Sequence, residues 1–147
     1  RSDFPNQVNN SLCFPGIFRG AIDSRATTIT DEMCFAAADA IAAYAKRHEE
    51  YGPGRIVPTM EESGLFPEVA AAVGIQAVRE GTARLELSYQ ELHSSAEALI
   101  GRSQGLTKRM MEEGFIPPPP EAAGSEAAGE EEPGAAGARE GEAKDDV

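Results

Sequence analysis

Hydrophobic residues recur with a helical period along most of residues 1–116, and turn-forming residues divide the pattern into segments. Four segments are long and regular enough to predict amphipathic helices. They run over approximately residues 15–23, 31–48, 65–81 and 89–100. The stretch GRSQG, residues 101–105, is expected to end or kink the fourth helix, and the short stretch after it, residues 106–115, is only marginally helical.

Residue types at the predicted helix starts support these boundaries. Thr30 is a predicted N-cap, and the acidic pair that follows it suits the positive end of a helix dipole. Ser88 and Glu91 have the S-x-x-E spacing of a capping box. Gly16 and Gly20 lie four residues apart on the first helix, where two glycines favour close packing against another helix. Together these signals predict a packed helical body.

Strand signals are nearly absent from the chain. The run RIV, residues 55–57, is the one stretch that suggests a short strand. The chain is therefore predicted to be mainly α-helical.

The last 31 residues differ in composition from the rest. Residues 117–147 begin PPPP, contain nine acidic and two basic residues, and include Val147 as their single large apolar residue. Such a segment cannot bury enough apolar surface to offset its loss of conformational entropy. We expect residues 1–116 to form the folded domain and residues 117–147 to form a disordered acidic tail that carries −7 of the net charge of −12.

Charge and hydropathy argue against two classes of function. Nucleic-acid binding is not expected, because the chain has no cluster of Lys and Arg to neutralise phosphates. No apolar run reaches the roughly 20 residues that span a bilayer, and no secretory signal pattern is present, so we predict a cytoplasmic protein with no membrane partner. Cys13 and Cys34 lack zinc-site spacing and are predicted to be buried free thiols.

Two adjacent asparagines, Asn9 and Asn10, are the most informative polar residues of the chain. Successive residues of an extended segment point to opposite sides, so the pair can serve two ligands, or one ligand and the scaffold. A carboxamide can pair with another carboxamide or donate to a carboxylate. The alternative is an Asx-type loop that only caps the following helix, and spacing alone does not separate the two interpretations.

A strong resemblance to the carboxy-terminal part of bacterial malic enzymes is carried by residues 1–33, RSDFPNQVNNSLCFPGIFRGAIDSRATTITDEM. The similarity continues through AAADAIA, residues 36–42. It persists more loosely through GPGRIVPTM and LFPEVAAAVGIQAVREGTARL, residues 52–60 and 65–85. The run PNQVNN joined directly to LCFP and FRGA makes the resemblance specific, whereas residues after about 102 match nothing distinctive.

The resemblance implies an oxidoreductase that oxidises malate with NAD or NADP and releases carbon dioxide to give pyruvate, assisted by a divalent cation, Mg or Mn. It implies that residues 1–116 are the carboxy-terminal part of an α/β Rossmann-like NAD(P)-binding domain. By matching positions, Asn10 is the expected substrate-binding residue, in contact with malate, and Asn9 the expected cofactor-binding residue, near the nicotinamide. Arg19, Asp23 and Arg25 are expected to form salt bridges on the surface or within helices.

No catalytic residue and no metal ligand is expected in this chain. The family's lysine and tyrosine acid–base pair, its carboxylate metal ligands and its glycine-rich dinucleotide loop lie upstream of the similar region, and no GxGxxG occurs here. The resemblance thus implies a fragment that begins mid-domain and is inactive alone. Its expected partners are malate, the missing amino-terminal part of the same chain and further copies in a homo-oligomer.

Two other hypotheses remain at this stage. The chain is alternatively a free-standing helical protein-interaction module, in which the acidic tail recruits a partner and the asparagine loop is only a cap. A different dinucleotide-dependent enzyme with a Rossmann-like end is less favoured, because the resemblance includes the asparagine pair together with its flanks.

Overall fold

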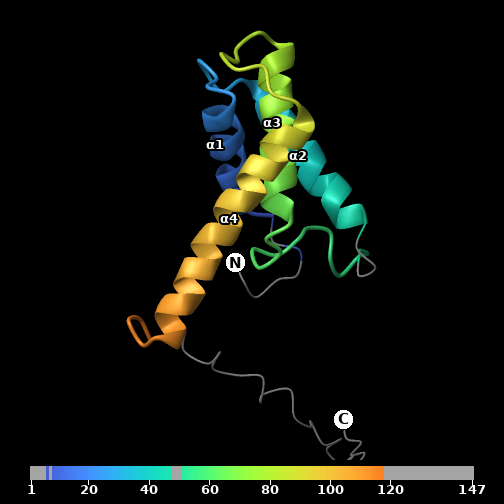
Figure 1. Cartoon of the computed structure of the whole chain (residues 1–147). Helices are drawn as coiled ribbons and strands as arrows, with labels where there is room; N and C mark the ends of the chain where they lie inside the picture. Colours follow the sequence, from blue (N-terminus) through green and yellow to red (C-terminus); the bar gives the residue numbers. More distant parts are fainter. Residues whose placement is uncertain (1–5, 7, 48–50, 118–147) are drawn as a thin grey trace, which may run out of the picture.

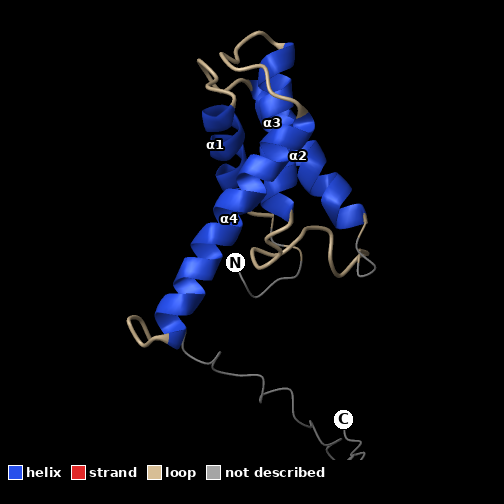
Figure 2. Ribbon diagram, in the orientation of Figure 1, coloured by secondary structure: helices blue, strands red, loops and turns tan. Residues whose placement is uncertain are grey.

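The computed structural model describes residues 6, 8–47 and 51–117, and within these ranges it contains helices and no strands (Figure 2). A short 3-10 helix, η1 (Asn10–Leu12), leads into α1 (Phe14–Asp23). The other helices are α2 (Asp31–Lys46), α3 (Leu65–Arg79) and α4 (Tyr89–Glu112). The predicted mainly helical character of the described residues is confirmed.

Helix α3 lies at the centre and packs against α1, α2 and α4 (Figure 1). Its inward positions are fully buried, as the helical period predicts, and are occupied by Leu65, Val69, Val73 and Ala77. These side chains form one core with residues from η1, α1 and α2, namely Leu12, Ile17, Met33 and Ala37. The core thus joins segments from both halves of the described chain.

The two glycines of α1 allow its close approach to α3, as predicted. A Cβ atom added at Gly16 would lie 2.4 Å from Cγ1 of Val69, and one added at Gly20 would lie 2.4 Å from the backbone oxygen of Ala70. Real Cβ atoms are not found at such distances, so a larger residue at either position requires the helices to separate.

Both predicted helix caps are present. Oγ1 of Thr30 accepts a hydrogen bond from the Met33 N–H at 3.1 Å and donates one to Oε2 of Glu80 at 2.6 Å, so it also ties the start of α2 to the end of α3. At the start of α4, the Ser88 hydroxyl accepts from the Glu91 N–H while the Glu91 carboxylate accepts from the Ser88 N–H.

A buried serine fixes the loop between α3 and α4. The Ser24 hydroxyl donates to the backbone oxygen of Gly20 at 2.7 Å, which satisfies its hydrogen-bonding needs without solvent. The Ser24 backbone oxygen accepts from the N–H groups of Arg84 and Leu85, both at 3.0 Å. These contacts hold the loop against the end of α1, so the turn after α1 and the turn before α4 support each other.

Three sequence predictions require correction. The GRSQG stretch does not end a helix, because α4 continues through residues 101–105 to Glu112, and its second half extends beyond the other three helices (Figure 1). The RIV stretch forms no strand; a single antiparallel bridge joins Gly52 and Arg55. Cys34 is exposed and Cys13 is only half-buried, although both are free thiols.

The predicted acidic tail, apart from Pro117, lies outside the described residues. Within the described ranges, none of the helices combines the length and the hydrophobicity needed to cross a membrane.

Candidate functional site

Asn9 and Asn10 lie together at the wall of a hollow of about 500 Å³. The rest of its wall is mainly apolar and comes from η1, α1, α2 and the loop that contains Ile56 and Val57. The hollow therefore brings together two stretches that lie more than forty residues apart in the sequence. A largely apolar cavity with a few convergent polar groups is the usual form of a small-molecule site.

The Asn9 side chain is partly committed to the backbone. Asn9 has an extended conformation, with φ −131° and ψ 141°, and is the N-cap of η1. Its Oδ1 atom accepts a hydrogen bond from the Ser11 N–H at 2.9 Å. This oxygen therefore caps η1, whereas α1 has no side-chain cap, and the NH₂ group of Asn9 has no hydrogen-bond partner among the described residues.

Asn10 is held by its backbone rather than by its side chain. Its backbone oxygen accepts from the Cys13 N–H and from the Cys13 thiol, each at 3.1 Å. Asn10 is exposed, and its carboxamide has no hydrogen-bond partner among the residues that the structure describes. Both the donor and the acceptor of this side chain are therefore available beside the hollow.

Asn6 is a supporting residue that the sequence analysis did not predict. Its Nδ2 donates to the backbone oxygen of Pro53 at 2.6 Å, and its Oδ1 accepts from the Ile56 N–H at 2.8 Å. Asn6 has φ +58°, a left-handed conformation that asparagine tolerates better than most residues. These bonds join the segment before the asparagine pair to the loop across the hollow. The sequence features that could have pointed to this contact were the first asparagine of the PNQVNN run and the GPG turn that contains Pro53.

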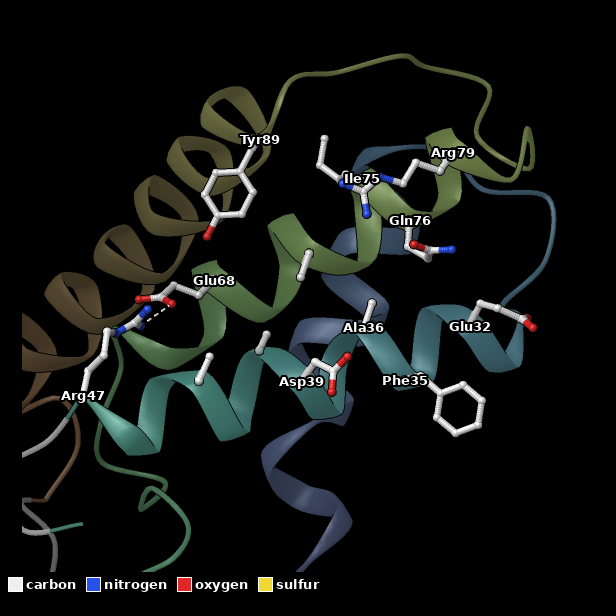
Figure 3. Close-up of a pocket in the computed structure, with 13 residues that line it drawn as sticks. Glu32, Phe35, Ala36, Asp39, Arg47, Glu68, Ile75, Gln76, Arg79 and Tyr89 are labelled. Carbon is white, nitrogen blue, oxygen red and sulfur yellow. Dashed lines mark hydrogen bonds and ion pairs between the residues drawn. The ribbon is translucent and has the colours of Figure 1, made fainter.

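A second hollow, of about 620 Å³, lies between α2 and α3 beside Tyr89 (Figure 3). Its floor is made of alanines, and its charged rim includes Arg47 and Glu68, which form an ion pair with an N–O distance of 2.5 Å. Burial is the largest cause that raises the pKa of Tyr89, so its hydroxyl stays protonated at neutral pH. We place the candidate site at the smaller hollow, because the asparagine carboxamides lie there and the main charged pair of the larger hollow is already neutralised.

The described residues do not form a metal centre. No group of three or more His, Cys, Asp or Glu side chains lies close enough together within these ranges to hold a metal ion. This chain's described part therefore does not fit the divalent cation that the resemblance implies.

Two of the three charged residues near the asparagine run pair with each other, as predicted. The Arg19 guanidinium and the Asp23 carboxylate form an ion pair one helical turn apart on α1. Arg25 instead occupies the turn after α1 with φ +50° and has no ion-pair partner among the described residues. None of the three lines the asparagine hollow.

Comparison with known proteins shows which protein family the chain belongs to. The family model described as "Malic enzyme, NAD binding domain" matches residues 1–81, which include the asparagine pair, α1, α2 and α3. The chain belongs to the malic enzyme family. The resemblance seen in the sequence is thereby confirmed, and the free-standing interaction module is not favoured.

Individual malic enzymes agree with the family match. The bifunctional malic/malolactic enzyme of Bacillus subtilis is 44% identical over 99 residues, which cover 67% of this chain and 24% of that protein. The NADP-dependent malic enzyme of Escherichia coli is 44% identical over 96 residues, or 56% of this chain and 13% of that protein. The chain therefore spans a quarter or less of the length of these relatives.

Solved malic enzyme structures share the fold of the described residues. The crystal structure of the Entamoeba histolytica malic enzyme is 42% identical with a TM-score of 0.75, and the match covers 79% of this chain and 24% of that one. The malic enzyme from Pyrococcus horikoshii is 40% identical with a TM-score of 0.69, covering 77% of this chain and 25% of that one. A mostly helical segment of this kind thus occurs in solved malic enzyme structures.

Proposed function

We propose that this chain forms the carboxy-terminal part of the NAD(P)-binding domain of a malic enzyme, which oxidises malate with NAD or NADP and decarboxylates it to pyruvate. The family match over residues 1–81, which places the chain in the malic enzyme family, is the observation that carries this proposal. The relatives include both NAD-dependent and NADP-dependent malic enzymes, so the proposal names both cofactors.

The remaining machinery is assigned to the rest of the protein. The chain has no glycine-rich dinucleotide loop, and its described residues hold no metal-ligand cluster. We therefore assign the catalytic acid and base, the divalent cation and the phosphate-binding loop to sequence outside residues 1–147, and we expect these residues alone to be inactive.

Asn10 is proposed to bind malate. Asn10 lines the hollow and its carboxamide has no hydrogen-bond partner among the described residues, so its NH₂ group can donate to a malate carboxylate. A hydrogen bond to a charged group contributes about 1.5–3 kcal/mol. The apolar wall strengthens such a bond, because electrostatic interactions grow as water is excluded.

Asn9 is proposed to face the nicotinamide end of the cofactor. Its Oδ1 atom is bonded to the Ser11 N–H, which fixes the rotation of the carboxamide. The NH₂ group is then oriented to donate to the carboxamide oxygen of a nicotinamide. In this proposal the carboxamide of Asn9 has a fixed orientation, and the carboxamide of Asn10 is free to adjust to malate.

Matched variants of the complete gene product test these roles. Asn10→Ala is expected to lower kcat/KM for malate about 10- to 150-fold, because about 1.5–3 kcal/mol of transition-state binding is removed. Asn9→Asp keeps an oxygen acceptor for the Ser11 N–H and removes the NH₂ donor, so it should raise the KM for the cofactor while preserving the cap.

The control is Gln90→Ala, which removes an exposed carboxamide from α4 and should leave all constants unchanged. Wild-type kinetics for Asn10→Ala would remove Asn10 from the malate site. Wild-type kinetics for Asn9→Asp would reduce Asn9 to a structural cap.

A further inference from the structure

Asn9 and Asn10 belong to a short segment that burial does not hold in place. Val8, Asn9 and Asn10 are all exposed, and we call residues 8–10 the asparagine segment. A segment with little buried apolar surface opens more easily than the core does, so its order depends on contacts at its two ends. The end toward α1 is fixed by the hydrogen bonds of η1 and by Leu12, which is buried in the core. The other end needs an anchor of its own.

Asn6 supplies the anchor at that other end. Its Nδ2 donates to the backbone oxygen of Pro53 at 2.6 Å, and its Oδ1 accepts from the Ile56 N–H at 2.8 Å. We call these two hydrogen bonds the Asn6 clamp. Because the donor and the acceptor of one planar carboxamide are both bonded, the group cannot rotate without breaking a bond. The clamp therefore fixes the orientation of this end of the segment as well as its distance from the loop.

The loop that Asn6 contacts has anchors of its own. Backbone hydrogen bonds between Gly52 and Arg55, at 3.0 and 2.9 Å, close a tight turn. Val57 packs against the core, and both Ile56 and Val57 line the hollow that contains the asparagine pair. The clamp thus attaches the asparagine segment to the wall of its own hollow.

The backbone at position 6 restricts which residue can form this clamp. Asn6 has φ +58°, in the left-handed region that glycine, asparagine and aspartate adopt most readily. Glycine has no side chain, and an ionised aspartate has no donor for the oxygen of Pro53. Asparagine alone of these three satisfies both the backbone conformation and the two hydrogen bonds.

We propose that Asn6 is a positioning residue, which holds Asn9 and Asn10 in the arrangement that binds the nicotinamide and malate. The inference rests on the proposed function, because that function assigns these ligands to the asparagine pair. Asn6 does not line the hollow, so it acts through the segment and not by contact with a ligand. A site whose supporting residues fix its geometry in advance does not spend binding energy on ordering itself.

Loss of the clamp is expected to act on binding rather than on turnover. Without it, only a fraction of the molecules holds the asparagine segment in the arrangement that binds, and the apparent affinity falls by that fraction. Once both ligands are bound, the segment is ordered as in the parent, so kcat stays the same. A residue that only stabilised the fold would instead lower the amount of active protein and leave the dissociation constant of the folded molecules unchanged.

Two variants of the complete gene product break the clamp in different ways. Asn6→Gly keeps the left-handed backbone and removes both hydrogen bonds. Asn6→Asp also accepts this backbone but loses the donor to Pro53, so it shows whether an effect arises from the clamp or from the flexibility of glycine. The matched control is Arg25→Gly, which places glycine at another residue with positive φ, +50°, outside the hollow.

Direct binding and hydrogen exchange measure the effect. The dissociation constant of NADH or NADPH, followed by nicotinamide fluorescence, should rise about tenfold in both Asn6 variants. Their kcat for malate at saturating ligands should stay within about twofold of the parent. Millisecond hydrogen exchange of a peptide that contains Ser11, whose N–H is bonded to Asn9, should be faster in both variants without any ligand. Arg25→Gly should leave all three quantities unchanged.

Three results would overturn the inference. An unchanged dissociation constant in both Asn6 variants would show that the clamp does not position the pair. A lower kcat with unchanged affinity would reduce Asn6 to a residue that stabilises the fold. Equally fast exchange at Ser11 in Arg25→Gly would show that the loosening is not specific to the clamp. If the parent neither binds a reduced cofactor nor oxidises malate, the proposed function fails, and exchange at Ser11 alone then decides whether Asn6 orders the segment.

Discussion

The approach of α1 to α3 leaves no room for a side-chain carbon at Gly20. A Cβ atom there would lie 2.4 Å from the backbone oxygen of Ala70, 2.9 Å from Cβ of Val73 and 3.0 Å from the backbone nitrogen of Gly74. Two of these atoms belong to the backbone of α3, which moves only if the whole helix moves. Gly20→Ala is therefore expected to separate the two helices and destabilise the fold.

The magnitude follows from two opposing effects. Overpacking of a filled interior costs about 1–3 kcal/mol, and contact with backbone atoms places Gly20 at the upper end of that range. Replacing glycine by alanine within a helix contributes about 1 kcal/mol in the opposite direction. The expected net loss is about 2 kcal/mol, which lowers the unfolding midpoint by about 10 °C in a domain of this size.

Thermal unfolding of residues 1–147, followed by far-ultraviolet circular dichroism, measures this loss. The matched control is Gly101→Ala in α4, where an added Cβ would meet no atom within 4 Å. At position 101 only the higher helix propensity of alanine acts, so the unfolding midpoint of Gly101→Ala should equal or exceed that of the parent. A midpoint for Gly20→Ala at or above that of the parent would refute the close packing of α1 on α3.

Three further predictions concern the caps and the tail. Thr30→Ala should lower the free energy of unfolding by about 1 kcal/mol, because the N-cap of α2 is lost. The control is Thr28→Ala at an exposed position, which should have little effect. Equal denaturation midpoints for the two variants would argue against the cap. Hydrogen bonds from the side chain and backbone of Ser88 hold the pKa of Glu91 below its ordinary value of 4.5. The Glu91 carboxylate therefore stabilises the fold above pH 4.5, and this stabilisation is lost as the pH falls below that value. In urea titrations at several pH values, the free energy of unfolding of Glu91→Gln should depend less on pH in the acid range than that of the parent. Removal of residues 117–147 should leave the activity of the complete gene product nearly unchanged, because their composition cannot form a core, and a severe loss of malate turnover would contradict the tail prediction.

Much of the helical framework was predictable because its signals are local. The caps at Thr30 and Ser88 mark helix starts through hydrogen bonds that span three residues, and the structure contains both. The glycines of α1 were interpreted correctly for the same reason, since their four-residue spacing defines one face of a helix.

The errors arose where the propensity of a short stretch did not decide its structure. Each glycine of the GRSQG stretch disfavours a helix by about 1 kcal/mol. The stretch nevertheless stays helical, because it lies inside α4 and helical residues continue on both sides of it. The RIV stretch lacks a neighbouring strand among the described residues, so its β-propensity has nothing to pair with. Propensity alone could not supply that information.

The sequence singled out the asparagine pair as candidate site residues, but it gave only part of the geometry around them. The asparagine pair stood out as two adjacent carboxamides, and the structure gives their side chains different surroundings, with Asn9 bonded to Ser11 and Asn10 unpartnered among the described residues. The role of Asn6 depends on a contact across 50 positions with Ile56, which no local pattern reveals. The hollow itself exists only once these segments are folded together.

Malate-dependent reduction of NAD and of NADP, with added magnesium or manganese, is the most direct test of the central claim. The complete gene product is assayed beside residues 1–147 alone. Activity in the complete product and none in residues 1–147 is the predicted result, because we propose that the catalytic acid and base and the metal ligands lie outside residues 1–147. Absence of malate-dependent reduction in the complete product, with either cofactor and either metal, would contradict the assignment as a malic enzyme.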